Sequence, residues 1–469
     1  MKPLLVLEIN EIPWRILDRY ANDAAYQNIH AFLHHSHQYT SLAVDTGELS
    51  PWVTWPTLHR GMNNDAHGVL NLGQDPASFR GVPIWQTLRD TGMSIGICGA
   101  MQSWPPMEPG AGGFYVPDTF AHDAACFPAY LEPLQTINLA QVKKNPRVSS
   151  STLPSFVEIK QLMACALRAG IRVRTLLRII AQLVGERFDK SLVARRPIFQ
   201  TILFWDVFRK HFNPDKPPAY ASFFTNHIAG VMHRYWRDIF PEDFAGSSAL
   251  SAPSREPLMR FALSVLNEML ADVLVWTKQN PQLTVVFASS MGQGPVHRDE
   301  HEGIELHISS VNALLAAAGL SEQDYKPLLA MVPQVAAEIA DATKRAAAIA
   351  WLQRCRSASG NALFAVKEIG ISLSISSILP PRADIELGTV HFDDTNMPFP
   401  KMGLKGVEIE AGTGYHIPEG SFAVYAPREG NDGDSILDQS RRTFAATRFK
   451  AWALAVVEQG HHDAKLLAD

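Results

Sequence analysis

Short apolar runs, separated by longer amphipathic stretches, set the pattern of this chain. Four runs stand out: residues 4–9 (LLVLEI), 94–99 (SIGICG), 283–288 (LTVVFA) and 422–425 (FAVY). Runs of this length without regular polar alternation are typical of strands that are covered on both faces of a parallel sheet. We therefore expect a sheet of buried strands.

Between these runs, apolar residues recur at helical spacing. Trp14, Leu17 and Tyr20 share one face of a predicted helix after the first run, and residues 256–279 predict a long helix before the third. Strands that alternate with helices predict a doubly wound, mainly parallel α/β sheet. In such a sheet, ligands gather at the carboxyl ends of the strands.

Two segments interrupt the alternation, so the predicted core is discontinuous. We expect core over residues 1–125, 215–310 and 385–469, with a terminal helix in the last part. A helical insertion is expected over 126–214, and a helical and hairpin insertion over 311–384.

The second insertion carries two distinct patterns. Residues 321–358 are rich in alanine and predict helix, whereas residues 364–379 alternate as a strand does. We expect the latter to form a hairpin on the edge of the sheet.

The first insertion is locally basic, with arginines at positions 168, 172, 174 and 178. One interpretation is a solvated helix face over a packed core. The other is a surface that contacts a membrane or an acidic partner.

Composition narrows the class of protein. The chain has 469 residues, with 46% hydrophobic and 19% charged, which is a globular balance. A net charge of −5 gives no global attraction to nucleic acid, and no such partner is expected. The four cysteines form no CxxC pair, and no apolar stretch is long enough to span a membrane or act as a signal peptide. We therefore expect a cytoplasmic protein.

Residues 51–68 (PWVTWPTLHRGMNNDAHG) carry the first candidate chemistry. Thr54 lies between aromatic residues, and Thr57 and a His67-Gly68 pair follow. The segment resembles the nucleophile turn of the alkaline phosphatase superfamily, in particular its phosphodiesterase and nucleotide pyrophosphatase branch. The resemblance implies that Thr54 is the nucleophile and that Thr57 replaces an asparagine that helps hold the phosphoryl oxygens. The alternative is a threonine in a tryptophan-rich loop with no chemistry.

A second motif lies near the C-terminus. Residues 414–420 (GYHIPEG) and the strand after them resemble the G-x-H-x-P-x-G signature of the same branch. By this resemblance, His416 matches the last ligand of the first metal site. Together the motifs imply an alkaline-phosphatase-like fold over roughly residues 1–125, 215–310 and 385–430.

A third motif, FTNHIAGVMHRYW, resembles the part of the family that supplies an Asp and a His four residues apart. His233 matches the histidine, but Ala229 stands where the Asp is expected, and the nearest candidates to replace it are His227 and Asn226. Because positions six apart do not share a helix face, a loop must precede the helix if His227 is to join His233. Three imidazoles, His227, His233 and His416, would then hold one ion of zinc or another divalent metal with an open fourth position.

The second metal site of the family is degenerate in this chain. The family's first-strand Asp maps to Asn10, and its Ser-Asp-His-Gly maps to residues 289–292 (SSMG), so Ser290 and Met291 replace a carboxylate and an imidazole. We expect Asn10 and Ser290 to contact substrate together with Thr57. The displaced carboxylates Glu8 and Glu11 are the candidates for a catalytic base.

Three further histidines, His297, His301 and His307, restore ligands only if their loop folds back; otherwise they are surface residues.

Three functions remain open at this stage. The first is a phosphate or sulfate ester hydrolase, such as a phosphodiesterase, with one metal ion and Thr54 as nucleophile. The second is a catalytically degenerate descendant, with or without metal, that binds a phosphorylated or sugar ligand or a protein partner. The third is a transferase that moves a phosphoryl-linked group. The intact histidines favour the first and third, and the lost ligands at Ser290 and Met291 favour the second.

Overall fold

The structure is a computed structural model that describes residues 2–47, 49–143, 166–244, 254–296, 304–328, 330, 334–378, 382–393, 395–408, 412–426, 441–460 and 467. The chain divides into two compact units. Unit 1 comprises Met1–Val69, Pro76–Pro295 and Gly414–Asp469, and unit 2 comprises Leu70–Asp75 and Val296–Thr413. Unit 2 is therefore longer at both ends than the insertion expected over 311–384.

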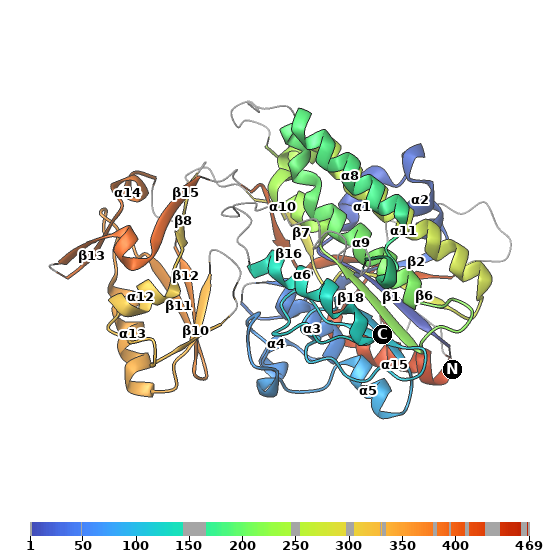
Figure 1. Cartoon of the computed structure of the whole chain (residues 1–469), viewed down its shortest axis with the longest axis horizontal. Helices are drawn as coiled ribbons and strands as arrows, with labels where there is room; N and C mark the ends of the chain where they lie inside the picture. Colours follow the sequence, from blue (N-terminus) through green and yellow to red (C-terminus); the bar gives the residue numbers. More distant parts are fainter. Residues whose placement is uncertain are drawn as a thin grey trace. The chain divides into compact units, whose positions relative to one another are not determined.

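Unit 1 is built on an eight-stranded sheet in the order β18-β2-β17-β6-β1-β5-β3-β4 (Figure 1). Its strands are β1 (Leu4–Ile9), β2 (Ser36–Leu42), β3 (Ile95–Cys98), β4 (Phe114–Val116), β5 (Tyr220–Thr225), β6 (Thr284–Ala288), β17 (Glu419–Tyr425) and β18 (Arg442–Ala445). The run from β6 to β4 is parallel throughout. β17 is antiparallel to both of its neighbours, and β18 is parallel to β2. The mainly parallel α/β class is confirmed, and each of the four apolar runs forms a strand.

Helices cover both faces of this sheet (Figure 1). They are α1 (Trp14–Tyr20), α2 (Gln27–His34), α3 (Pro51–Arg60), α4 (Asn64–His67), α5 (Ile84–Asp90), α6 (Glu132–Lys143), α8 (Val173–Phe188), α9 (Arg196–His211), α10 (His227–Ile239), α11 (Glu256–Gln279) and α15 (Phe449–Gln459). Leu5, Leu7 and Ile9 of β1 share one core cluster with α1, α2, α9, α10 and α11. The long helix predicted over 256–279 is confirmed in full by α11.

No helix among the described residues is long and apolar enough to cross a membrane.

Unit 2 has its own sheet and core. A four-stranded antiparallel sheet runs in the order β11-β12-β10-β9, and two further strand pairs, β13-β14 and β15-β8, belong to the same unit. Its elements are β8 (Ile304–Ile308), α12 (Val311–Ala317), β9 (Lys326–Leu328), β10 (Val335–Glu338), α13 (Ala342–Arg354), β11 (Phe364–Ile369), β12 (Ser372–Ser377), α14 (Arg382–Leu387), β13 (Thr389–Phe392), β14 (Thr395–Pro398) and β15 (Leu404–Glu408). A separate cluster of buried apolar residues fills this unit.

Two expectations for this region were wrong in detail. The hairpin of residues 364–379 forms as β11 and β12, but it belongs to the sheet of unit 2 and not to the edge of the main sheet. Only the second half of 321–358 is helical, as α13, and β9 and β10 occupy the first half. β10 pairs with β12, and β9 pairs with β10, which places both short segments in a hydrogen-bonded sheet; such tertiary contacts override the helix propensity of alanine.

Candidate metal centre

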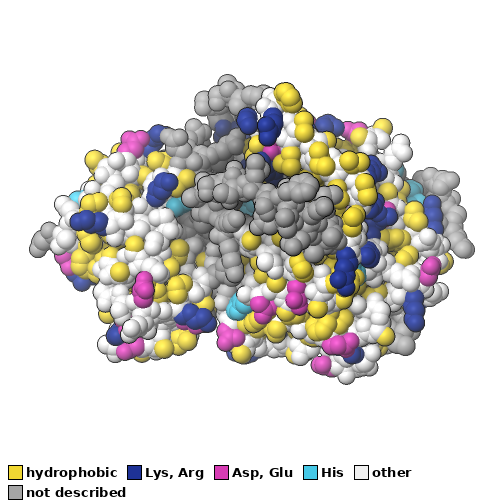
Figure 2. Space-filling view, viewed as in Figure 1, with side chains coloured by type: hydrophobic (Ala, Val, Ile, Leu, Met, Phe, Trp, Pro, Cys, Tyr) yellow, Lys and Arg dark blue, Asp and Glu magenta, His cyan; other side chains and the backbone are white. Residues whose placement is uncertain are grey.

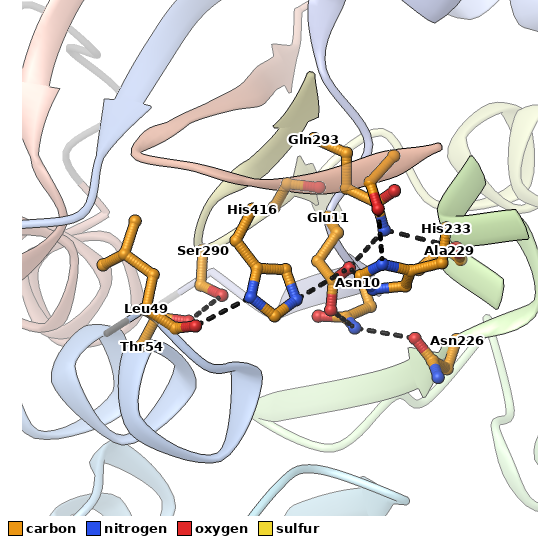
Figure 3. A network of polar contacts seen from close by, with 12 residues as sticks. Asn10, Glu11, Leu49, Thr54, Asn226, Ala229, His233, Ser290, Gln293 and His416 are labelled. Atoms are coloured by element: carbon orange, nitrogen blue, oxygen red, sulfur yellow. Dashed lines mark hydrogen bonds and ion pairs between the residues drawn. The ribbon is translucent and has the colours of Figure 1, made fainter. Parts of the chain in front are cut away.

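The segments that follow strands β1, β5 and β6 of the main sheet, together with two short strands that pair with each other, supply the polar side chains of one site (Figure 3). Asn10 and Glu11 follow β1, and Asn226 follows β5 at the start of α10, which carries His233. Ser290 follows β6. The short strands β7 (Gly292–Pro295) and β16 (Gly414–Ile417) pair so that Gln293 lies opposite His416.

Close backbone approach explains the glycines that flank these residues. A Cβ atom at Gly292 would collide with the carbonyl oxygen of Glu419, and one at Gly414 would collide with that of Met232. Both positions therefore require glycine, and the tight packing that results brings β7, β16 and α10 together.

Glu11 is the centre of the site. One carboxylate oxygen, Oε1, accepts a hydrogen bond of 2.7 Å from the amide of Asn10. The other, Oε2, accepts from the amide of Gln293 and lies 2.8 Å from Nε2 of His233 and 3.5 Å from Nε2 of His416. Glu11 has a φ of 58°, a left-handed conformation that is uncommon outside glycine and is often found at functional sites.

Backbone carbonyl groups fix the orientation of both imidazoles. Nδ1 of His233 lies 3.1 Å from the carbonyl oxygen of Gly414, and Nδ1 of His416 lies 2.7 Å from that of Leu49. A carbonyl oxygen only accepts, so each Nδ1 carries the hydrogen and donates it. In the neutral imidazole, the Nε2 lone pair then faces Glu11. This is the arrangement that outer hydrogen bonds give to metal-binding histidines.

The electrostatics of the cluster call for positive charge between these groups. Burial alone would raise the pKa of the Glu11 carboxyl, but the charges and hydrogen bonds of His233 and His416 outweigh it and hold that pKa well below its usual range. Neutral imidazoles would instead point two lone pairs at a buried carboxylate, which is repulsive. Two protonated imidazoles would lie with ring centres only 5.0 Å apart. One divalent cation satisfies all three groups at once.

The donor atoms also fit the size of a metal ion. The ligand atoms of Glu11, His233 and His416 all lie within 4.8 Å of one another. Tetrahedral zinc with bonds of about 2.1 Å places its ligand atoms about 3.4 Å apart. The distances from Oε2 of Glu11 to Nε2 of His233 and of His416, 2.8 and 3.5 Å, bracket that value. Two histidines and one glutamate form a known catalytic zinc set, which keeps a fourth position for water or substrate.

The site has access to solvent from one side. The side chain of His233 is 33% exposed and that of His416 is 10% exposed, whereas Glu11 is 2% exposed. A ligand in the fourth position would therefore arrive along the histidine side of the cluster.

Asn10 orients Glu11 through hydrogen bonds of its side-chain amide. Its amide nitrogen donates to Glu11 and, over 2.7 Å, to the side-chain oxygen of Asn226. Its amide oxygen accepts from the indole N–H of Trp55 over 2.8 Å. Because Trp55 is only a donor, it fixes which way the amide points. The contacts of Asn10 in this structure orient Glu11; its expected contact with substrate stays a prediction.

Thr54 and Ser290 face each other beside the cluster of Glu11, His233 and His416 (Figure 3). Their hydroxyl oxygens are 2.8 Å apart, and both residues have no exposed surface. The structure thus brings the predicted nucleophile and one predicted substrate-contacting residue together. In this structure the two hydroxyl groups are hydrogen-bonded to each other.

Thr57 lies in a different network on α3. Its hydroxyl is 2.5 Å from Asp45 and 2.9 Å from Nε2 of His67. Nδ1 of His67 accepts from the N–H of Val69, so Nε2 donates to Thr57 and Thr57 donates to Asp45. Burial, with the charges of nearby arginines, lowers the pKa of His67 to about 4, which keeps it neutral. These hydrogen bonds stabilise helix α3, and because the Thr57 hydroxyl already donates its hydrogen to Asp45, it has none left for a phosphoryl oxygen.

Two sequence candidates lie outside the cluster. Glu8 pairs with Nε2 of His59 at 2.9 Å in the buried layer beneath α3. His227 uses Nδ1 toward the Thr225 hydroxyl, 2.8 Å away, and Nε2 toward the carbonyl of Ala262, 3.2 Å away.

His227 cannot join the other histidines because it starts α10 without a preceding loop. Six residues along one helix separate it from His233, so the two rings leave the helix in different directions. The residue that this geometry groups with His233 and His416 is Glu11, for which the sequence had suggested the role of base.

Gln293 is the residue that sequence reasoning missed. It sits between two glycines in β7, and its amide donates both to Glu11 and to the carbonyl of Ala229, 3.2 Å away. A lone polar side chain in a buried glycine-rich strand was the available signal. Met291 has no exposed surface and belongs to the core.

The remaining sequence candidates are three histidines between residues 297 and 307. His307 lies in β8 of unit 2 and is 3.0 Å from Glu305. His297 and His301 lie outside the described residues.

Comparisons with known proteins gave structural matches only. No family model matches the chain, and no curated protein matches it. Among solved structures, ectonucleotide pyrophosphatase/phosphodiesterase 5 of mouse and of human is similar at 11% identity, covering 97% of this chain and 95% of that chain, with TM-scores of 0.41 and 0.42. Phosphonoacetate hydrolase of Sinorhizobium meliloti, with phosphonoformate bound, is similar at 12% identity, covering 97% and 96%, with a TM-score of 0.42.

Proposed function

We propose that this chain binds one divalent metal ion through Glu11, His233 and His416 and acts there on a phosphate or sulfate ester. The observation that carries the metal site is the orientation of the two imidazoles. Both Nδ1–H groups donate to backbone carbonyls, and both Nε2 atoms face one buried carboxylate. The ester follows from the resemblance of residues 51–68 and 414–420 to the phosphodiesterase branch of the alkaline phosphatase superfamily.

Each residue of the cluster has a definite task in this proposal. His233 and His416 offer neutral Nε2 atoms, and Glu11 offers a carboxylate oxygen held in place by Gln293 and Asn10. A bound divalent ion would supply positive charge to a phosphoryl or sulfuryl oxygen. The exposed side of His233 leaves room for the ester to approach.

Thr54 is the proposed nucleophile. Its oxygen would form the new bond to phosphorus or sulfur while the ester oxygen leaves with the electrons of the broken bond. The hydroxyl proton needs an acceptor. Among the described residues, the partner of the Thr54 hydroxyl is the Ser290 hydroxyl, and neither Glu8 nor Glu11 bonds to it. A well-placed base is worth about 100- to 10,000-fold in rate, so we expect slow turnover of generic aryl esters.

Metal analysis of purified protein tests the binding site. After zinc loading and removal of excess metal, we expect at most about one zinc per chain. His416→Ala should lose it. His227→Gln should keep it, because His227 is not in the cluster, and it serves as the matched histidine control. Loss of zinc in His227→Gln but not in His416→Ala would overturn the proposed ligand set.

A second candidate is a non-hydrolytic descendant that binds a phosphorylated or sugar ligand. The observation in its favour is that Thr54 and Ser290 are fully buried and hydrogen-bonded to each other. Attack requires Thr54 to leave that partner and meet the substrate. A binding protein has no such need.

An ester panel distinguishes these candidates. A hydrolase should release alcohol from a phosphate or sulfate ester in water, lose this activity in Thr54→Ala, and regain part of it in Thr54→Ser. A phosphoryl transferase should release alcohol only when an acceptor alcohol is added. Ligand-induced thermal stabilisation without any release would favour the binding protein, and unchanged turnover in Thr54→Ala would exclude the threonine nucleophile.

A further inference from the structure

Helix α8 in unit 1 buries polar side chains and exposes apolar ones, which is the reverse of the usual pattern for a surface helix. Its buried residues are polar: Thr175, Gln182 and Glu186. Its exposed residues are mainly large and apolar, and five of them lie along one face: Val173 (61% exposed), Leu177 (60%), Ile180 (56%), Val184 (53%) and Phe188 (87%). Their spacing of three or four residues places them in one stripe, about 22 Å long at 1.5 Å per residue.

Hydrogen bonds hold the helix in this orientation. The Thr175 hydroxyl donates to Asp206 over 2.6 Å, and the amide of Gln182 donates to the backbone carbonyl of Leu192 over 2.7 Å. Glu186 also forms an ion pair with Arg196 at 2.7 Å. Rotating α8 to bury the apolar stripe would break all three contacts and strand a buried carboxylate, so the stripe is a stable feature of the surface.

The surroundings of the stripe are positively charged. Residues 166–196 contain eight Lys or Arg and two Asp or Glu, a formal charge of +6 within a chain of net charge −5. Arg172 pairs with Asp206 and Arg178 with Glu268, which leaves +4 when these two carboxylates are counted. Figure 2 shows hydrophobic side chains gathered over α8 with basic side chains near them. Arg174 and Arg187, on either side of the stripe, are exposed and form no ion pair with other described residues.

We propose that α8 is a membrane-docking helix that lies in the surface of an anionic lipid bilayer, with the stripe Val173–Phe188 among the acyl chains and the flanking arginines at the phosphate groups. An apolar face bordered by arginines is the pattern of interfacial helices. Lipid phosphates match the positive charge that remains on this segment after Asp206 and Glu268 are counted. A symmetric contact between two copies would instead bring this charge against itself.

Vesicle flotation with the full-length protein tests this proposal. We expect binding to vesicles of equimolar phosphatidylcholine and phosphatidylglycerol, weaker binding at high salt, and little binding to phosphatidylcholine alone. The double substitution Leu177→Gln with Ile180→Gln should lower the partition coefficient at least about tenfold, because two large apolar side chains lose their burial. Arg174→Gln with Arg187→Gln should lower it about tenfold on anionic vesicles.

The matched control is Val275→Gln, which changes a side chain of α11 that is 52% exposed and lies outside the stripe. It should bind vesicles as the unaltered protein does. All of these positions are exposed, so circular dichroism and melting temperature should stay nearly unchanged and show that the variants fold.

Three results would overturn the proposal: no binding to anionic vesicles, equal binding by the Leu177/Ile180 variant, or equal loss with Val275→Gln. Concentration-dependent dimerisation that disappears in the Leu177/Ile180 variant, without vesicle binding, would assign the stripe to a second copy of this chain.

Discussion

Glu11 and the two histidines depend on one another at the residue scale. The carboxylate is buried, so an uncompensated negative charge there would be costly. His233 and His416 compensate it, and the backbone carbonyls of Gly414 and Leu49 hold their Nε2 atoms inward. The same geometry suits a metal ion, because a cation replaces two protons and retains every other contact.

Gln293→Leu tests the support of this carboxylate. The substitution removes the amide that donates to Glu11 Oε2 and to the carbonyl of Ala229, while keeping a similar volume. Outer hydrogen bonds of this kind are typically worth 10- to 100-fold in metal affinity. We expect a loss of about that size in zinc affinity, measured by competition with a chromophoric chelator, with a folded protein by circular dichroism. Unchanged affinity would show that Gln293 does not orient Glu11.

At the scale of elements, α10 is anchored by the residue at its start. His227 bonds to Thr225 at the end of β5 and to the carbonyl of Ala262 in α11. Burial lowers the pKa of His227 to about 4, and a histidine in the unfolded chain titrates near 6.5. The folded protein therefore holds fewer protons on this residue than the unfolded chain between these two pH values.

This difference predicts the direction of a pH effect on stability. The contribution of His227 to the free energy of unfolding should be largest above pH 6.5. It should fall as the pH drops toward about 4, because His227 takes up a proton in the unfolded chain at a higher pH than in the folded protein. A pKa difference of about 2.5 corresponds to at most about 3 kcal/mol. In His227→Gln this part of the pH dependence should disappear, as measured by urea unfolding between pH 4 and 7. An identical slope in both proteins would show that His227 is not the group responsible.

The hydrophobic pattern of the sequence predicted the buried strands of the main sheet correctly. The buried runs became β1, β3, β6 and β17, since a strand covered on both faces is apolar throughout. The helix predicted around β9 and β10 was wrong because β10 pairs with β12, which is distant in the sequence, and β9 pairs with β10. Alternation within one segment does not reveal which sheet it joins, and the hairpin of β11 and β12 shows this.

At the scale of the whole molecule, the candidate site is gathered from residues more than 400 positions apart. The motif positions of Thr54, His233 and His416 led to its location, because carboxyl ends of parallel strands share one edge. The group of Glu11, His233 and His416 could not be predicted in this way. Glu11 lies one residue after Asn10, the position of the family's first-strand aspartate. The left-handed backbone conformation of Glu11 turns its side chain toward the histidines. His227 was a plausible ligand in the sequence, but its place at the start of α10 turns it toward α11.

X-ray absorption spectroscopy of the zinc-loaded protein tests the metal centre most directly. We expect one zinc with a first shell of nitrogen and oxygen at about 2.0–2.2 Å, outer-shell scattering from two imidazoles, and no sulfur. The signal should be lost in Glu11→Gln and in His416→Ala and should persist in His227→Gln. A spectrum that requires three imidazoles or a sulfur ligand, or a protein that takes up no divalent metal, would contradict the proposed centre of Glu11, His233 and His416.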